Sequence, residues 1–434
     1  MANSKEEQVA EKKTAMRNLY ISGFLSVAQT VITIQSEPLL IKELAGGDIG
    51  LTARMLANTQ GLVGVLGIII NQIGGKFSDA LGRKQFLALG PVANILFGLL
   101  IYRNSHKRQL VLPLRVLRAI LTTFSSTVML TAALSDVAQG AELGAAISKM
   151  GAAVGAGIVI TPFVEALFLQ RSNSPRTAYL LLSMLGCVHA AFVGLSVPET
   201  LRRAQRKTLA SAMQLSSINP FGFLNIFRRG STGLQKMICI QTLQMFLEGK
   251  NLSDLVELWK REHLKWTVEG SRNYVMIYGT LSILSGVYVT PYFLKNLTAR
   301  GFTSATNLLN LFGFLVRGAR EQSWIFLLAV IPMLPGVNGA SATALKSIST
   351  DLATSEGFGK GEFAAWTNNL RALAGAIATV LYGNYYSWCK RTGAPAGTTF
   401  VLAGLIGAAL PELLLRLTKD SEMQRSKDEV PEAA

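Results

Sequence analysis

Ionisable side chains recur inside stretches that are otherwise apolar, where a charge is a candidate for binding a solute, an ion or a proton. Lys250, Asp254 and Glu257 stand at i, i+4 and i+7, on one face of a helix, and Glu248 lies off that stripe. Charges within a membrane span face water or protein rather than lipid, so the spacing predicts a substrate-binding face. A structural Lys250–Asp254 ion pair is the alternative. Asp254 and Glu257 lie outside the hydrocarbon if the span ends early.

Polar groups in two later apolar runs extend this candidate substrate site. Asn338 follows Pro335 and Gly336, and Asn368 and Arg371 lie in the run that begins near Glu362. By the same reasoning these side chains are expected to line a water-filled path.

Two arginines lie within the apolar run that begins near Val111. Arg115 and Arg118 are about 6 and 11 Å inside its outer end at a rise of about 1.5 Å per residue. An arginine at this depth costs several kcal/mol unless it faces a partner or water. Arg115 is close enough to the end for its side chain to snorkel to the outer headgroups, and Arg118 lies deeper.

Enzyme chemistry finds little support in the sequence. His106, His189 and His263 are isolated from one another, and the chain has neither G-x-S-x-G nor G-x-x-x-x-G-K-[ST]. Gly155 and Gly157 lie within an apolar run and lack the third glycine of a nucleotide-binding loop. We therefore expect no enzymatic activity, no metal site and no cofactor.

The elements that must position these residues are membrane helices. Hydrophobic residues make up 50% of the 434 residues and charged residues only 16%. Apolar runs near the ~20 residues needed to span a bilayer recur along the whole chain, which predicts an all-α polytopic membrane protein. The net charge of +16 comes from basic residues at the ends of these runs, as expected for contacts with lipid headgroups rather than nucleic acid.

The apolar runs predict twelve transmembrane helices in two six-helix bundles. The first bundle covers residues 18–198 and the second covers 234–418. A basic cytoplasmic linker, 199–233, joins them, and cytosolic tails cover 1–17 and 419–434. Lys and Arg are enriched in the segments placed inside by this arrangement, so both termini are expected in the cytosol.

A short charged stretch between the second and third runs carries the most specific signal. It contains Gly75, Asp79, Gly82, Arg83 and Lys84 in the pattern G-x-x-x-D-x-x-G-R-K. Its glycines permit a sharp turn, its carboxylate favours the N-terminus of the next helix, and its cations favour the cytoplasmic side. The pattern resembles the signature loop of the major facilitator superfamily of secondary transporters. This resemblance implies that the five residues take part in gating.

The fifth run combines small residues with a proline. Gly151, Gly155 and Gly157 suit close helix packing, and Pro162 would bend the helix. The run resembles the fifth-helix motif of drug–proton antiporters, especially the tetracycline-efflux-like branch, in part of its pattern.

Arg118 is similar in position to the fourth-helix arginine to which that branch assigns proton coupling. A guanidinium keeps its charge, so a carboxylate must carry the proton, and Glu165 and Glu37 are the candidates toward the outer end.

The resemblance implies a monomeric carrier that moves a small organic solute by alternating access, with proton-driven export as the first interpretation. Symport or facilitated uptake is the alternative within transport. A membrane receptor or scaffold without flux is the alternative outside transport, and the intact Asp79 and the intramembrane charges argue against it.

Overall fold

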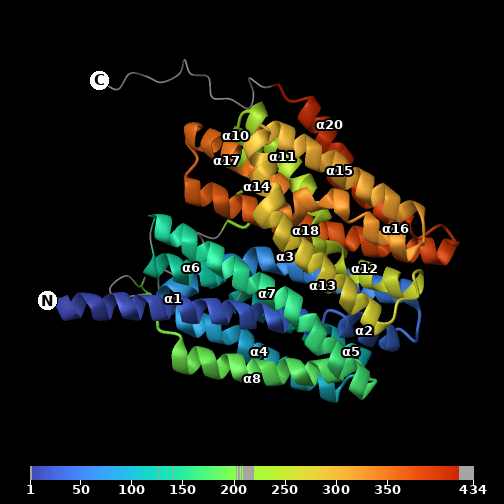
Figure 1. Ribbon diagram of the computed structural model, residues 1–434, viewed down its shortest axis with the longest axis horizontal. Helices are drawn as coiled ribbons and strands as arrows, with labels where there is room; N and C mark the ends of the chain where they lie inside the picture. The colour runs from blue at the N-terminus through green and yellow to red at the C-terminus, as the bar shows by residue number, and fades with distance from the viewer. Residues whose placement is uncertain are drawn as a thin grey trace. The chain divides into compact units, whose positions relative to one another are not determined.

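Helices form all the regular structure in the described part of the chain, residues 2–125, 127–138, 140–201, 203, 206, 208 and 219–419 of the computed structural model (Figure 1). Seven helical stretches in this part are long and apolar enough to cross a membrane, judged by length and composition. The expected all-α polytopic fold is confirmed.

The first half of the chain folds into long helices separated by short breaks. They are α1 (Ala2–Val31), α2 (Ser36–Leu44), α3 (Ile49–Leu81), α4 (Arg83–Arg103), α5 (Arg108–Thr122), α6 (Thr127–Val137), α7 (Gly140–Ser172) and α8 (Thr177–Ser196). A 3₁₀ turn, Thr123–Ser125, follows α5. The residues expected to form an N-terminal tail are helical from Ala2 onward and continue directly into the first span.

The second half has more interruptions within its spans. Its α-helices are α10 (Leu224–Arg229), α11 (Thr232–Gln244), α12 (Gly249–Glu262), α13 (Val268–Leu284), α14 (Thr290–Asn296), α15 (Ala299–Ala319), α16 (Ser323–Leu328), α17 (Ala340–Ser355), α18 (Lys360–Thr392), α19 (Thr398–Gly404) and α20 (Leu410–Arg416). The 3₁₀ segments η4 (Met245–Leu247) and η6 (Ile331–Gly339) divide two spans, and the π-helical segments η5 (Ser285–Val289) and η7 (Leu405–Ala409) interrupt two more. Pro335 lies within η6 and cannot donate a backbone hydrogen bond.

The chain forms two compact units. The first contains Met1–Ile218 and Trp266–Gly279, and the second contains Asn219–Lys265 and Thr280–Ala434. The start of α13 joins the first unit because it contacts α7: Gln170 Nε2 donates to Glu269 at 2.9 Å, and the Arg272 guanidinium lies 5.4 Å from the centre of the Phe163 ring. The boundaries drawn from the sequence at 198 and 233 stay predictions.

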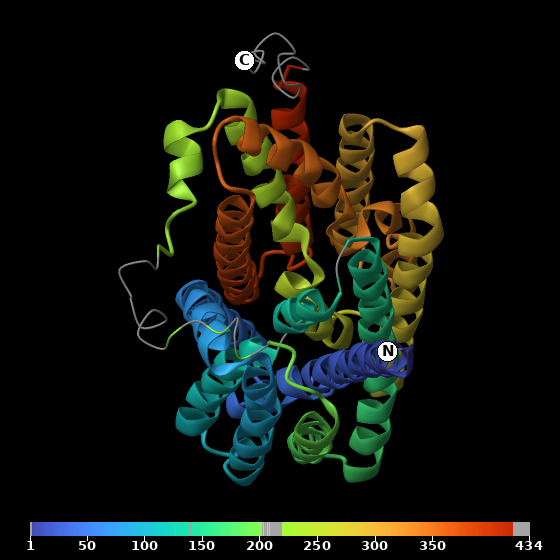
Figure 2. The same ribbon diagram turned by 90° about the vertical axis from the view of Figure 1, so that its left-hand side faces the viewer.

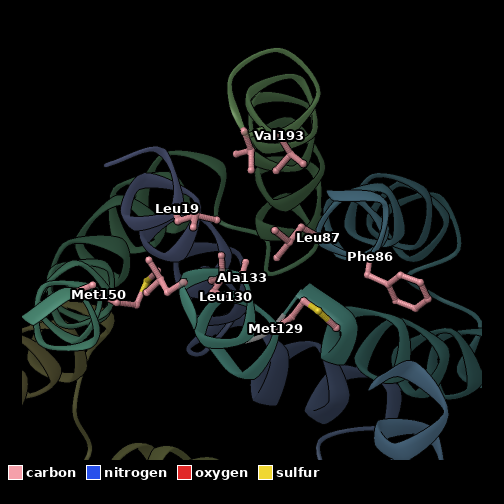
Figure 3. Packing of buried hydrophobic residues seen from close by; sticks show 11 residues of the cluster. Leu19, Phe86, Leu87, Met129, Leu130, Ala133, Met150 and Val193 are labelled. Atoms are coloured by element: carbon pink, nitrogen blue, oxygen red, sulfur yellow. The ribbon is translucent and has the colours of Figure 1, made fainter. Parts of the chain in front are cut away.

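The core of the first unit lies where α1, α4, α6, α7 and α8 meet. Within this unit α1 packs against α7, and α4 packs against α8 (Figure 2). Leu19, Leu130 and Val193 are fully buried there (Figure 3). Phe86 makes an edge-on contact with Phe124. This packing fixes the helices that carry the polar residues described next.

Candidate functional site

The first span is broken at residues 32–35, and the break places a carboxylate inside the first unit. Pro38 has no N–H to donate to the carbonyl of Ile34, and its ring clashes with that carbonyl in a continuous helix, so α1 ends at Val31. The chain turns and resumes as α2, in which Pro38 is the third residue and is tolerated. Glu37 immediately precedes it and is only 8% exposed.

Glu37 contacts two arginines of α5, Arg115 and Arg118. Arg115 Nε contacts Glu37 Oε1, and Arg118 Nη2 lies 3.2 Å from Glu37 Oε2. Arg115 and Arg118 are three residues apart, so one helix face presents both to the carboxylate. Arg115 is 5% exposed, so it does not reach the outer headgroups as the sequence suggested. Its guanidinium is paired with Glu37 inside the protein instead. Of the two candidate carboxylates, Glu37 is the one in contact with Arg118.

Other polar groups complete this cluster, and sequence reasoning missed them. Arg115 Nη1 donates to the hydroxyl of Thr59 and, at 3.3 Å, to the carbonyl of Leu56, both on α3. The Arg118 guanidinium lies 5.9 Å from the ring centre of Tyr179 on α8. Tyr179 is fully buried, and its hydroxyl has no hydrogen-bond partner among the described residues. A buried charge needs such a shell, because an unpaired one would be strongly unfavourable.

Glu165, the second candidate, lies against the break itself. Its carboxylate accepts hydrogen bonds from the backbone N–H of Gln35 and of Ser36, and from the Ser36 hydroxyl at 2.6 Å. Gln35 Nε2 donates to the carbonyl of Pro162, one turn earlier on α7. Glu165 is fully buried, so α7 and the broken first span are joined through it.

A line of buried polar contacts continues along α1 away from this cluster. Gln29 accepts from Asn94 Nδ2 at 2.6 Å and donates to the carbonyl of Leu185. Ser22 lies 2.9 Å from His189 Nε2. His189 therefore has a polar partner on α1, although nothing near it in the sequence indicated one.

The signature loop forms a tighter turn than the sequence indicated. α3 continues to Leu81 and α4 begins at Arg83, so only Gly82 separates the two helices. Asp79 lies in the last turn of α3, where Arg83 Nη1 is 2.8 Å from Asp79 Oδ1. Arg83 Nε is also 3.2 Å from Asp136 Oδ2 on α6. Arg83 thus joins the ends of α3 and α6.

Asp79 does not cap the next helix, contrary to expectation. Glu199 accepts the N–H of Arg83 at 2.9 Å and the N–H of Lys84 at 3.4 Å, and it pairs with Arg206 at 3.3 Å. Because α3 extends past Asp79, that carboxylate faces Arg83 rather than the first N–H groups of α4. Lys84 Nζ donates to the carbonyl of Gly194.

Replacing Gly82 by alanine should destabilise the protein by about 1–3 kcal/mol. Gly82 has φ +113°, a conformation that L-residues rarely adopt, and a Cβ there would overlap the Glu199 carboxylate. Thermal unfolding of the purified protein measures the effect. The matched control is Gly151→Ala, because no atom lies within 4 Å of that Cβ position. Equal unfolding temperatures for the two variants would refute the steric account.

The glycines of α7 differ in how closely neighbouring helices pack against them. A Cβ at Gly157 would lie 3.1 Å from the carbonyl oxygen of Phe24, so this glycine permits close packing on α1. Gly151 has no such neighbour because it lies on a different face of α7. It is therefore not the packing glycine that the sequence suggested. Gly155 also lies within α7, and Pro162 lies inside the same helix.

In the second unit, Glu257 on the charged face of α12 forms ion pairs within the same helix. Glu257 is 4% exposed and lies 2.7 Å from both Lys260 Nζ and Arg261 Nε. Asp254 is half-buried on the same helix. The side chain of Lys250 lies outside the described residues, so its suggested pair with Asp254 stays a prediction.

Among the other predicted substrate residues of this unit, two form an ion pair. Glu248, at the N-terminal end of α12, pairs with Arg371 of α18 at 2.6 Å, and the Arg371 side chain is 49% exposed. Asn368 is exposed on α18. Asn338 lies in η6, and its side chain is outside the described residues. The structure therefore brings together Glu248 and Arg371, which the sequence did not pair.

An all-α chain with apolar spans, a discontinuous first span and charges buried between its helices defines a class of polytopic membrane proteins built for solute movement. Residues 19–379 match the family model of the Major Facilitator Superfamily, and the chain belongs to that family. The family assignment made from the signature loop is therefore confirmed.

Curated relatives share a modest part of the sequence. Hippocampus abundant transcript-like protein 1 of Bos taurus is 23% identical over 326 residues, which covers 75% of this chain and 62% of that protein. Hippocampus abundant transcript 1 protein of Mus musculus is 23% identical over 331 residues, covering 75% and 64%. The chain thus spans less than two thirds of the length of these relatives.

Solved structures share the fold at low identity. A mutant of the nucleoside transporter NupG has a TM-score of 0.72 at 11% identity, covering 93% of this chain and 100% of that chain. The D-xylose–proton symporter has a TM-score of 0.69 at 14% identity, covering 95% and 99%. The human organic anion transporter MFSD10 (TETRAN) has a TM-score of 0.64 at 16% identity, covering 93% and 99%.

Proposed function

We propose that this chain exports a small organic solute by alternating access and exchanges it for protons. The observation that carries the proposal is the Glu37–Arg115–Arg118 cluster, a titratable carboxylate held between two permanent cations in the apolar interior of the first unit. A structural contact alone does not require this arrangement, because a well-packed apolar cluster is often at least as stable as a buried ion pair.

The chemistry of the cluster suggests how a proton would be coupled. A guanidinium keeps its proton at any relevant pH, so Arg115 and Arg118 cannot carry it. Both guanidinium groups contact the Glu37 carboxylate. If alternating access separates the carboxylate from the arginines, an unpaired buried charge is costly and proton binding relieves the cost. Solute binding and proton binding then favour different conformations, which is the requirement for coupled exchange.

The resemblance to drug–proton antiporters favours export, and we propose that both termini lie in the cytosol. Protons are the proposed coupling ion, a monomer is the proposed assembly, and the five residues of the signature loop are the proposed gating residues. The solved relatives support transport as such: they are a nucleoside transporter, a D-xylose–proton symporter and an organic anion transporter.

Flux in proteoliposomes tests the proposal. A panel of nucleosides, sugars, peptides and organic anions would be measured with and without an imposed pH gradient. Exchange of one solute against protons supports the proposal. Movement of solute and protons in the same direction would establish symport instead. Flux indifferent to the pH gradient would indicate a facilitator, and no flux for any solute would favour a receptor or scaffold.

We further propose that Glu248 and Arg371 line the solute path in the second unit. Arg371 is half exposed although it is paired, so its guanidinium remains available to a ligand. The deciding comparison is Glu248→Ala, Arg371→Ala and the double variant, measured for flux and for folded protein in the membrane. We expect the double variant to fold and to lose at least about tenfold in flux, or about 1.4 kcal/mol. Near-normal flux in the double variant would assign the pair to structure.

A further inference from the structure

At the N-terminus of α2, the break in the first span leaves the backbone N–H groups of Gln35 and Ser36 without a helical acceptor. In the first turn of α2, the N–H of Glu37 bonds to the carbonyl of Thr33 at 2.8 Å, and Pro38 has no N–H. The N–H groups of Gln35 and Ser36 remain. An unsatisfied N–H in the membrane interior costs several kcal/mol, so these two groups need an acceptor.

Glu165 supplies that acceptor from another helix. Its Oε1 lies 2.8 Å from Ser36 N and 3.1 Å from Gln35 N, and its Oε2 lies 3.2 Å from Gln35 N. The Ser36 hydroxyl adds a third donor to the same carboxylate. These are charge-assisted hydrogen bonds at the positive end of a helix, where a negative charge is favoured.

A capping side chain at the N-terminus of α2 itself would not satisfy these two N–H groups. An N-cap side chain normally accepts from the second or third N–H of the helix. Here the second belongs to Glu37, which already bonds to Thr33, and the third position is Pro38. Gln35, the N-cap residue, makes no side-chain cap bond. The local sequence therefore depends on a cap from a distant segment.

We infer that Glu165 is a positioning residue: it caps α2 from α7 and thereby holds Glu37 against Arg115 and Arg118. The inference rests on the proposed function in assigning proton coupling to Glu37. Glu37 is the second residue of α2, so fixing the first N–H groups of that helix fixes the direction in which its carboxylate points. Glu165 then acts through Glu37 and does not itself carry the coupled proton.

The test compares Glu165→Gln with Glu142→Gln in the full-length reconstituted protein. Both residues belong to α7, but Glu142 is exposed and pairs with Lys12. Hydrogen exchange of the peptide that contains Gln35 and Ser36 measures how well the cap protects their N–H groups. This measurement does not depend on transport. We expect exchange there to rise at least about tenfold in Glu165→Gln and to stay unchanged in Glu142→Gln, since a glutamine keeps only one acceptor oxygen and loses the charge.

The pH profile of flux separates positioning from the other roles. If Glu165 positions Glu37, Glu165→Gln should keep a pH-dependent flux with its midpoint moved by roughly one pH unit, because the contacts of Glu37 with the two arginines change. A flux that no longer depends on pH would make Glu165 the proton carrier and overturn the inference. A normal pH midpoint of flux, together with normal hydrogen exchange at Gln35 and Ser36, would also overturn it.

Ser36→Ala provides a second variant in case Glu165→Gln folds poorly. It removes one donor and leaves the Glu165 charge in place, so it should produce the same changes with smaller size. If Ser36→Ala leaves both hydrogen exchange and the pH midpoint unchanged, the cap does not set the position of Glu37. If the wild type shows no pH dependence, the proton-coupling proposal fails, and hydrogen exchange still decides whether Glu165 caps α2.

Discussion

Replacing Glu37 by glutamine should abolish the acceleration of flux by a pH gradient, while exchange of solute down its own gradient stays measurable. Glutamine fills the same space but cannot take up and release a proton, so the conformational change loses its coupling. We expect the acceleration of flux by the pH gradient to fall by at least about tenfold, or about 1.4 kcal/mol in activation free energy. Proteoliposome flux at a fixed solute gradient, with and without the pH gradient, measures this effect.

The control for this variant is Glu142→Gln, which neutralises an exposed carboxylate of the same unit and should leave the response unchanged. Glu37→Ala adds a stability readout, because it leaves two buried guanidinium groups without their carboxylate. The free energy of unfolding should drop by about 3–5 kcal/mol, the usual cost of removing one partner of a buried ion pair. A Glu37→Gln protein that still responds fully to the pH gradient would exclude Glu37 as the coupling residue.

Replacing Arg83 by alanine should reduce turnover severely while the protein remains folded in the membrane. Arg83 lies between Asp79 and Asp136, so its removal leaves two carboxylates near each other without the cation that joins α3 and α6. We expect at least about a tenfold loss of turnover, and a smaller loss for Asp79→Asn, which leaves the contact between Arg83 and Asp136 in place.

Arg103→Ala is the matched control, since Arg103 ends the same helix that Arg83 begins and its side chain is exposed. Initial rates of solute exchange per folded molecule provide the measurement. If Arg83→Ala turns over at the Arg103→Ala rate, the contacts of Arg83 only set the topology of the loop and the gating role is wrong.

The fold could be predicted because its determinants are local. Lengths of apolar runs and Gly82 mark helices and their ends, and they do so without reference to the rest of the chain. The break before Pro38 was not predicted. The cap of α4 could not be predicted in this way. Glu199 lies 116 residues from Arg83, and nothing near Glu199 in the sequence indicates that its carboxylate faces the N–H of Arg83.

The charged members of the candidate site could be predicted from the sequence, but their pairings could not. Arg118, Glu37 and Glu165 stand out as charges in apolar runs, but only the packing of α5 against α3 and α2 shows which carboxylate meets the arginines. Thr59 and Tyr179 belong to the cluster yet carry no signal, because a threonine or a tyrosine in a membrane span is ordinary. The contacts of Glu257 are different: Lys260 and Arg261 follow it at i+3 and i+4, so the sequence alone contained them.

The cap of α2 has a consequence for how the protein is made. Gln35 and Glu165 are 130 residues apart in the chain, so a ribosome that adds about 5–20 residues per second completes Gln35 roughly 7 to 26 s before Glu165. During that interval the N–H groups at the break have no protein acceptor, and hydrocarbon offers none. The break should therefore stay near water or the insertion machinery until α7 arrives. This span then reaches its final structure only after α7 has been made.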